Sequence, residues 1–244
     1  MRVIALEEHY TTAMLPAVGT MRRPDIGPKL EDLGAGRLAD MDAAGIDLQV
    51  LSPSSPGTFL DDLAFSPVFA CAESLGVPVY LHPTPPTPAV FDAYFSGLPG
   101  CTGEVLAGAA WGWHAETGLH ALRLVLGGVF DRFPRLEVVI GHMGENIPFS
   151  LARADSVLSP AATHLKRRVA EYFHEHFYIT TSAYFTLPPF QCALGVFGID
   201  RLLFSVDYPF SDNLDARRFL DNVPLGPGDL EKLAHGNAEA LLGL

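Results

Sequence analysis

The stretch ALEEH at residues 5–9 ends a short apolar run in two carboxylates and an imidazole, and it decides how the rest of the chain is interpreted. Side chains alternate between the two faces of a strand, so Glu7 and His9 can share one face while Glu8 takes the other. Three further apolar runs end in the same way: VPVYLH at His82, LEVVIGH at His142 and RLLFSVD at Asp207. Four parallel strands that each end in an imidazole or a carboxylate indicate a mononuclear metal site at the mouth of an α/β barrel.

Length and composition favour one globular domain. The 244 residues, 48% of them hydrophobic, can bury a substantial core and approach the usual size of a (β/α)8 barrel, so we expect a single domain over residues 1–244. The formal charge of −12 argues against nucleic acid as a partner. No apolar run reaches the roughly 18 residues of a membrane span and no leader precedes the first strand, so we expect a soluble, cytoplasmic protein. Three cysteines without C-x-x-C spacing argue against disulfides and a thiolate metal site.

Strand-like and helix-like runs alternate along the chain. The expected strands are residues 2–7, 47–52, 77–81, 136–140, 177–182 and 201–206. The expected helices are residues 37–44, 66–75, 115–130, 161–175, 188–197 and 228–242. This alternation predicts a parallel sheet with helices outside it. In the helix at 115–130 we expect Leu119, Leu122, Leu126 and Val129 to form the buried stripe, with His120 pointing outward.

Six strands are two fewer than a closed (β/α)8 barrel has. At roughly 30 residues for each βα step, about 60 to 80 residues are missing. The expected place is between residues 54 and 58, where SSPG runs into TFLDD without an intervening helix. Because a six-stranded remnant would expose two sheet edges, we favour a segment omitted from a longer native chain over a natural or engineered deletion.

Several further residues are candidates for the site. Glu145 follows His142 by three residues, where its carboxylate can hydrogen-bond an imidazole and fix its tautomer, or can simply sit favourably near a helix N-terminus. The connection at 83–113 is rich in proline and aromatic residues and is expected to be an aromatic lid. Weaker candidates for substrate contact are Arg153, which could instead pair with Asp155, and Trp113 and His114. His174 and His176 precede a strand and are assigned to structure.

Seven stretches together match a known family: ALEEH at 5–9, DMDAAGIDLQVLS at 40–52, VPVYLHP at 77–83, HALRLVLGGVFDRFPRLEVVIGHMGENIPF at 120–149, FYITTSAYF at 177–185, DRLLFSVDYPF at 200–210 and GNAEALLGL at 236–244. With them the chain resembles the metal-dependent amidohydrolase superfamily. The resemblance is to its branch of nonoxidative decarboxylases related to γ-resorcylate (2,6-dihydroxybenzoate) decarboxylase and aminocarboxymuconate semialdehyde decarboxylase. Each stretch alone would be weak, but their combination is specific.

The resemblance implies roles for particular residues. Glu7, His9, His82 and Asp207 would hold one divalent metal ion, with Zn²⁺ favoured and Mn²⁺ or Mg²⁺ as alternatives. His142 and Glu145 would serve catalysis together with Asp207, which would be both ligand and proton carrier. Many hydrolases of the superfamily begin with His-x-His; a glutamate in the first position favours decarboxylation.

We therefore expect a carboxy-lyase that protonates the ring carbon of a hydroxylated benzoate and releases CO2, with no organic cofactor. The alternative enzyme is a hydrolase of a lactone or amide that uses metal-activated water. The other alternative is a noncatalytic metal-binding or interaction protein. The expected partners are a small aromatic acid and further copies of the chain, as a homodimer or homotetramer, with neither nucleic acid nor membrane.

Overall fold

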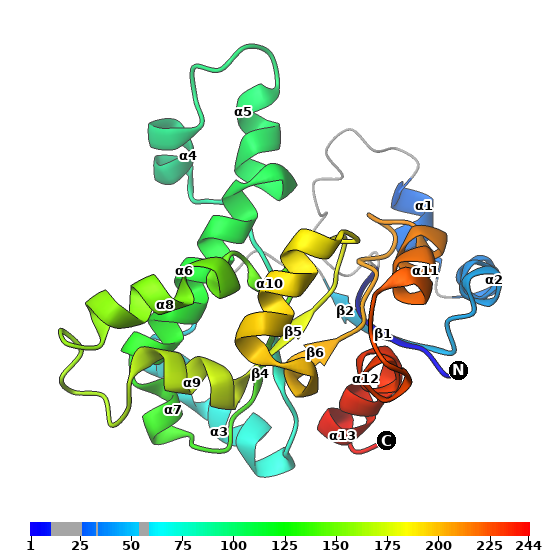
Figure 1. The fold of residues 1–244 in the computed structure, drawn as a ribbon. Coiled ribbons are helices and arrows are strands. Elements are labelled where there is room, and N and C mark those ends of the chain that lie inside the picture. The colour runs from blue at the N-terminus through cyan, green and yellow to red at the C-terminus, as the bar shows by residue number, and fades with distance from the viewer. Residues whose placement is uncertain (11–25, 33, 54–58) are drawn as a thin grey trace. The chain divides into compact units, whose positions relative to one another are not determined.

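The computed structural model describes residues 1–10, 26–32, 34–53 and 59–244 (Figure 1). The chain divides into two compact units. The first holds residues 1–55, 141–143 and 178–244, and the second holds residues 56–140 and 144–177. The single domain over residues 1–244 stays a prediction. So does the missing segment, whose expected place at residues 54–58 lies outside the described residues.

The strands of the first unit are parallel. β1 (Ile4–Tyr10) pairs with β2 (Leu48–Pro53). β5 (Phe177–Thr180), which belongs to this unit from its second residue, pairs with β6 (Leu202–Leu203). A parallel bridge between Leu6 and Ser205 places β1 beside the end of β6. This bridge therefore connects the β1–β2 pair to the segment that follows β6.

β1 carries an irregularity just before Glu8. Ala5 pairs with Gln49 while Glu8 pairs with Leu51, so β1 advances three residues where β2 advances two. An extra residue of this kind is a β-bulge, which re-aims the side chains around it. Simple alternation counted from Ala5 therefore does not predict where Glu8 points.

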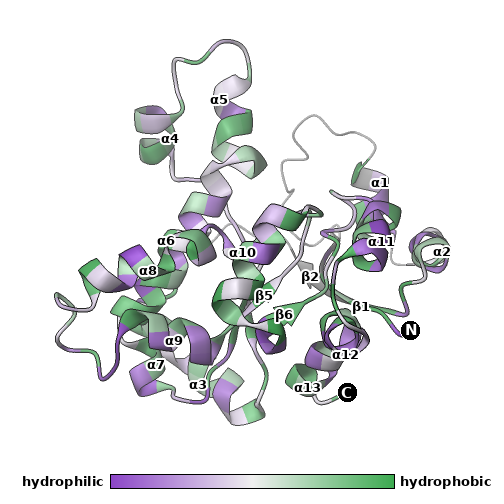
Figure 2. Ribbon diagram, in the orientation of Figure 1, coloured by the Kyte–Doolittle hydropathy of each residue, from purple (hydrophilic) through white to green (hydrophobic). Residues whose placement is uncertain are grey.

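The described residues of the first unit form the α-helices α1 (Ile26–Glu31), α2 (Ala35–Ala44), α10 (Leu187–Phe197), α11 (Asn213–Asn222), α12 (Pro227–Glu231) and α13 (Asn237–Leu242). α2 contacts α11, and α13 contacts β6. Asn237 Nδ2 donates to the carbonyl oxygens of Ile199 at 2.7 Å and Leu202 at 2.8 Å, which ties the last helix to the start of β6. Figure 2 shows β6 in the hydrophobic colour and much of α11 in the hydrophilic colour, as expected for an inner strand and an outer helix.

In the second unit β3 (Val79–Leu81) pairs in parallel with β4 (Val138–Ile140). Its helices are α3 (Ser66–Leu75), α4 (Pro88–Tyr94), α5 (Thr102–Val105), α6 (Gly112–Leu126), α7 (Val129–Arg132), α8 (Ile147–Leu158) and α9 (Val169–His176). α9 contacts both α6 and α8. None of the helices in the described ranges combines the length and apolarity needed to cross a bilayer.

All six expected strands are present, but the buried stripe expected in the helix at 115–130 is only partly correct: Val129 is buried, Leu122 and Leu126 are half-buried, and Leu119 is exposed. Leu119 is 47% exposed, whereas Gly118, Ala121 and Val125 are buried. The inward face includes the small residues Gly118 and Ala121, and at Gly118 the backbone of Glu145 approaches the helix closely. His120 does not point outward either: its Nε2 accepts the backbone N–H of Leu60 at 2.7 Å.

Two other expectations also need correction. The single helix expected at 161–175 begins only at Val169, and α8 precedes it. The carboxylate of Glu171 accepts the backbone N–H of Arg168 at 2.7 Å, which starts α9 at that point. The connection at 83–113 is not a plain loop, because it contains α4 and α5. Its role as an aromatic lid stays a prediction.

Candidate active site

Asp207 lies in the turn that follows β6 and is 9% exposed. Its φ of +71° is in the left-handed region, which a non-glycine residue adopts at a cost. Its carbonyl oxygen accepts the backbone N–H groups of Phe210 at 2.8 Å and Ser211 at 3.0 Å. A tight turn therefore fixes the point from which the Asp207 carboxylate projects.

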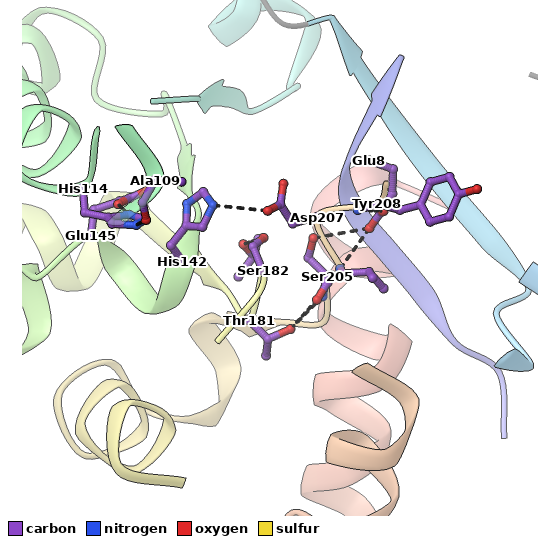
Figure 3. A network of polar contacts seen from close by, with 12 residues as sticks. Glu8, Ala109, His114, His142, Glu145, Thr181, Ser182, Ser205, Asp207 and Tyr208 are labelled. Atoms are coloured by element: carbon purple, nitrogen blue, oxygen red, sulfur yellow. Dashed lines mark hydrogen bonds and ion pairs between the residues drawn. The ribbon is translucent and has the colours of Figure 1, made fainter. Parts of the chain in front are cut away.

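The segment that leads into this turn is held from the side of β5. Thr181 Oγ1 donates to the carbonyl oxygen of Ser205 at 2.7 Å and accepts the Ser205 backbone N–H at 2.9 Å (Figure 3). The backbone N–H of Ala183 donates to the carbonyl oxygen of Val206 at 3.3 Å. These bonds continue the pairing of β5 with β6 beyond the last strand residues, up to the residue before Asp207.

Glu8 approaches the same segment from β1 and is fully buried. Its Oε1 accepts the backbone N–H of Val206 at 3.0 Å, and its Oε2 accepts that of Tyr208 at 2.8 Å (Figure 3). Ser205 Oγ lies 3.5 Å from Oε1. Burying a carboxylate is costly unless it is hydrogen-bonded, and these donors meet that need. Sequence reasoning gave Glu8 no part in the site.

A buried cation lies near these residues. Burial lowers the pKa of the Arg37 guanidinium, and the negative charges around it, that of Glu8 among them, oppose this change. The guanidinium carbon of Arg37 lies 4.8 Å from the centre of the Tyr208 ring. Burial, and then the hydrogen bond from its hydroxyl to Asp40 at 2.6 Å, raises the pKa of Tyr208. The hydroxyl therefore stays protonated at neutral pH.

His142 faces Asp207 within the first unit. Its Nε2 lies 3.8 Å from Asp207 Oδ2, and the residue is 8% exposed (Figure 3). The His142 ring meets the ring of Tyr184 edge-on, with 6.2 Å between ring centres. A separation of 3.8 Å is too long for a good hydrogen bond. It does allow both groups to reach one substrate atom or one ion placed between them.

The backbone that begins at His142 is unusual. All five residues from 142 to 146 have positive φ, between +49° and +85°, although only Gly144 is a glycine. Non-glycine residues in this region are strained, and such strain clusters at functional sites. The strained backbone at residues 142–146 thus gives a second reason, besides the residue types, to regard this segment as part of a functional site.

In the second unit Glu145 binds an imidazole, as its type and position suggested. The partner that the structure describes is His114 on α6, whose Nδ1 lies 2.6 Å from Glu145 Oε2. His114 Nε2 lies 2.8 Å from the carbonyl oxygen of Ala109. Both His114 and Glu145 are buried. The carboxylate and the carbonyl together fix the position of the His114 ring.

The other expected ligands are described only in part. His82 directly follows β3 in the second unit and is half-buried. β1 carries Glu7 and His9, but their side chains lie outside the described part of the chain. The ligand set of Glu7, His9, His82 and Asp207 therefore stays a prediction.

The weaker candidates for substrate contact lie in different environments. Arg153 lies exposed on α8, and Asp155 is bound by Arg168 instead, whose Nε donates to Asp155 Oδ2 at 3.1 Å. The pairing of Arg153 with Asp155 is wrong, because residues two apart on a helix do not face each other. The indole Nε1 of Trp113 is buried, and the described residues give it no hydrogen-bond partner. Contact of Arg153, Trp113 or His114 with substrate stays a prediction.

Of the two histidines assigned to structure, His176 packs inside the second unit. His176 is buried; its Nδ1 lies 2.9 Å from the Leu136 carbonyl oxygen, and its ring stacks on Phe130 with 4.5 Å between centres. His174 is exposed.

The donor chemistry of the first unit fits a divalent metal ion. Asp207 presents a buried carboxylate, and an imidazole nitrogen lies within 4 Å of it. Oxygen and nitrogen donors of this kind suit Zn²⁺ and Mn²⁺.

Comparison with known proteins places the chain in a family. The Amidohydrolase family model matches residues 3–244. Decarboxylase orsB of Emericella nidulans is 31% identical, over 98% of this chain and 96% of the relative. That alignment spans 319 positions, 75 more than this chain has residues. γ-Resorcylate decarboxylase of Rhizobium radiobacter is 38% identical over 74% of this chain, but the match covers only 54% of the relative, about half its length.

Among solved structures, a dihydroxybenzoic acid decarboxylase from Polaromonas sp. with bound manganese and the inhibitor 2-nitroresorcinol is similar. It is 26% identical, with a TM-score of 0.89, over 100% of this chain and 97% of the other. This similarity confirms the barrel-type α/β fold class. Together, the family model and these relatives show that the chain belongs to the Amidohydrolase family, in its γ-resorcylate decarboxylase-like branch of carboxy-lyases.

Proposed function

We propose that this chain catalyses the metal-dependent, nonoxidative decarboxylation of a hydroxylated benzoate. The observation that carries the proposal is the buried pair of Asp207 and His142, 3.8 Å apart, in a chain whose relatives are decarboxylases. The substrate class is argued from a similar protein that holds 2-nitroresorcinol, a ring with two phenolic oxygens.

The chemistry requires a proton at the ring carbon that bears the carboxylate. Direct loss of CO2 would leave an unstable aryl carbanion, whereas prior protonation breaks aromaticity. The bond to the carboxylate can then cleave, and its electron pair restores the ring. A divalent metal ion, when bound, would orient the substrate carboxylate and a neighbouring phenolic oxygen and reduce their charge.

Two side chains suit the remaining steps. Asp207 would deliver the proton from its carboxyl group to the ring carbon, as a general acid. His142 would hold the phenolic oxygen through Nε2, the nitrogen that faces Asp207. Both are buried, so bulk water does not compete for the proton. In the second unit Glu145 would act by fixing His114, its hydrogen-bonded partner.

The test is a substrate panel with matched variants. Purified protein is loaded with Mn²⁺, Zn²⁺ or Mg²⁺ in turn and incubated with hydroxybenzoates, lactones and amides, with CO2 and acid production followed separately. We expect CO2 from at least one hydroxybenzoate and no hydrolysis. Asp207→Asn should abolish turnover even where metal is retained, while the exposed control Asp200→Asn should keep it. Acid production from a lactone or amide, or normal turnover by Asp207→Asn, would refute the proposal.

A further inference from the structure

We propose that Glu8 is a positioning residue that holds Asp207 through the backbone amides on either side of it. Neither the family similarity nor the predicted ligand set gives Glu8 a part. The role of Asp207 in this inference rests on the proposed function. The way in which Asp207 is held rests only on the geometry of the structure.

The geometry is that of a two-point clamp. Glu8 Oε1 binds the N–H of Val206 at 3.0 Å, Glu8 Oε2 binds the N–H of Tyr208 at 2.8 Å, and Asp207 lies between these two residues. Figure 3 shows the Asp207 side chain directed toward His142, while Glu8 lies on the other side of the segment. Glu8 therefore holds the backbone on either side of Asp207 through the amides of residues 206 and 208.

The segment needs such a clamp because its backbone is strained. Asp207 has a φ of +71°. Without Glu8, the backbone N–H groups of the two residues beside it would be buried and would need other hydrogen-bond acceptors. The carbonyl oxygens of Val206 and Asp207 are bound from Ala183 and from the turn at Phe210. Glu8 supplies the two acceptors that complete this set of bonds.

Only a carboxylate of this length fits. Glutamine has one acceptor oxygen and an NH2 group that would face a second donor, so it can keep one of the two bonds at most. Aspartate keeps the charge but is one methylene shorter and cannot reach both amides from the same Cα position. The two variants thus separate the loss of charge from the loss of reach.

The experiment measures metal binding without relying on turnover. Metal-depleted wild type, Glu8→Gln, Glu8→Asp and the exposed control Glu31→Gln are titrated with Mn²⁺ by calorimetry, and the melting temperature of each is recorded. Loss of a residue that orients a ligand typically weakens metal affinity about 10–100-fold. We expect a Kd raised by about that factor in both Glu8 variants, and a Kd within about twofold of wild type in the control.

Several results would overturn the proposal. A lower melting temperature with an unchanged Kd in Glu8→Gln would make Glu8 merely structural, and a normal Kd in Glu8→Asp would mean that charge alone suffices. If the variants do not fold, hydrogen exchange of the wild type decides: the amides of Val206 and Tyr208 should exchange slowly, and fast exchange at both refutes the clamp. A wild type that releases no CO2 from any hydroxybenzoate, with a weakened Kd in Glu8→Gln, would end the proposed function and leave the clamp supported.

Discussion

Replacing Gly118 with alanine should strain the contact between α6 and the backbone of Glu145. An added Cβ would lie 2.5 Å from the Glu145 carbonyl oxygen, whereas ordinary contacts begin near 3.4 Å, so the two segments must separate by about 0.9 Å. Overpacking of this kind costs about 1–3 kcal/mol, and the helix propensity of alanine returns about 1 kcal/mol. We expect Gly118→Ala to be destabilised by about 0–2 kcal/mol.

The matched control is Gly195→Ala, in the interior of α10, where an added Cβ meets nothing within 4 Å. That variant should gain up to about 1 kcal/mol, so the difference between the two substitutions isolates the clash. Urea unfolding gives the free energies, and CO2 release gives the rate. His114 lies one helical turn before Gly118 and binds Glu145, so the rate should also fall in Gly118→Ala. Equal stability of the two variants would show that the close approach is not present in solution.

Three further predictions follow from single residues. Burial lowers the pKa of His120 from 6.5 to about 4. Between these two pH values His120 therefore binds a proton in the unfolded chain but not in the folded chain. Because solvent partly screens this half-buried ring, we expect about 1–3 kcal/mol of stability to be lost as the pH falls from 7 to 4, and His120→Gln should lack this loss in urea titrations. At saturating Mn²⁺, Glu7→Gln should bind less metal per chain while Glu8→Gln still reaches the wild-type amount; elemental analysis showing the reverse order would contradict the ligand set. His142→Asn should lower kcat at least 10-fold with metal retained, and equal kcat in His142→Asn and the exposed His174→Gln would exclude the phenol-binding role.

The strands could be predicted because each one carries a run of apolar residues that local pattern reveals. Two of the four residues at which the apolar runs end, His142 and Asp207, follow β4 and β6 and face each other. The helix starts were harder. α9 begins where Arg168 is capped by Glu171, a local hydrogen bond that the hydrophobic pattern does not contain.

The buried face of α6 shows a different limit. Periodicity chose the large leucines, yet the inward positions hold Gly118 and Ala121. These small residues are buried because the Glu145 backbone comes within contact distance of the helix at Gly118. Such an approach depends on a segment 27 residues away in the chain, so no local count of apolar residues could have found it.

Glu8 is the residue for which strand alternation was least informative. Alternation assigns each side chain to one face of the strand. It placed Glu8 on the face away from the predicted metal site and therefore predicted no role for its carboxylate. The bulge between Ala5 and Glu8 and the amides of residues 206 and 208 appear only when β1 and the segment after β6 are placed side by side. In ALEEH the two glutamates would then have different tasks: Glu7 as a ligand and Glu8 as the anchor for a ligand on another strand. Glu7→Gln should therefore weaken a donor to the metal itself, whereas Glu8→Gln should leave every donor present and misplace the carboxylate of Asp207.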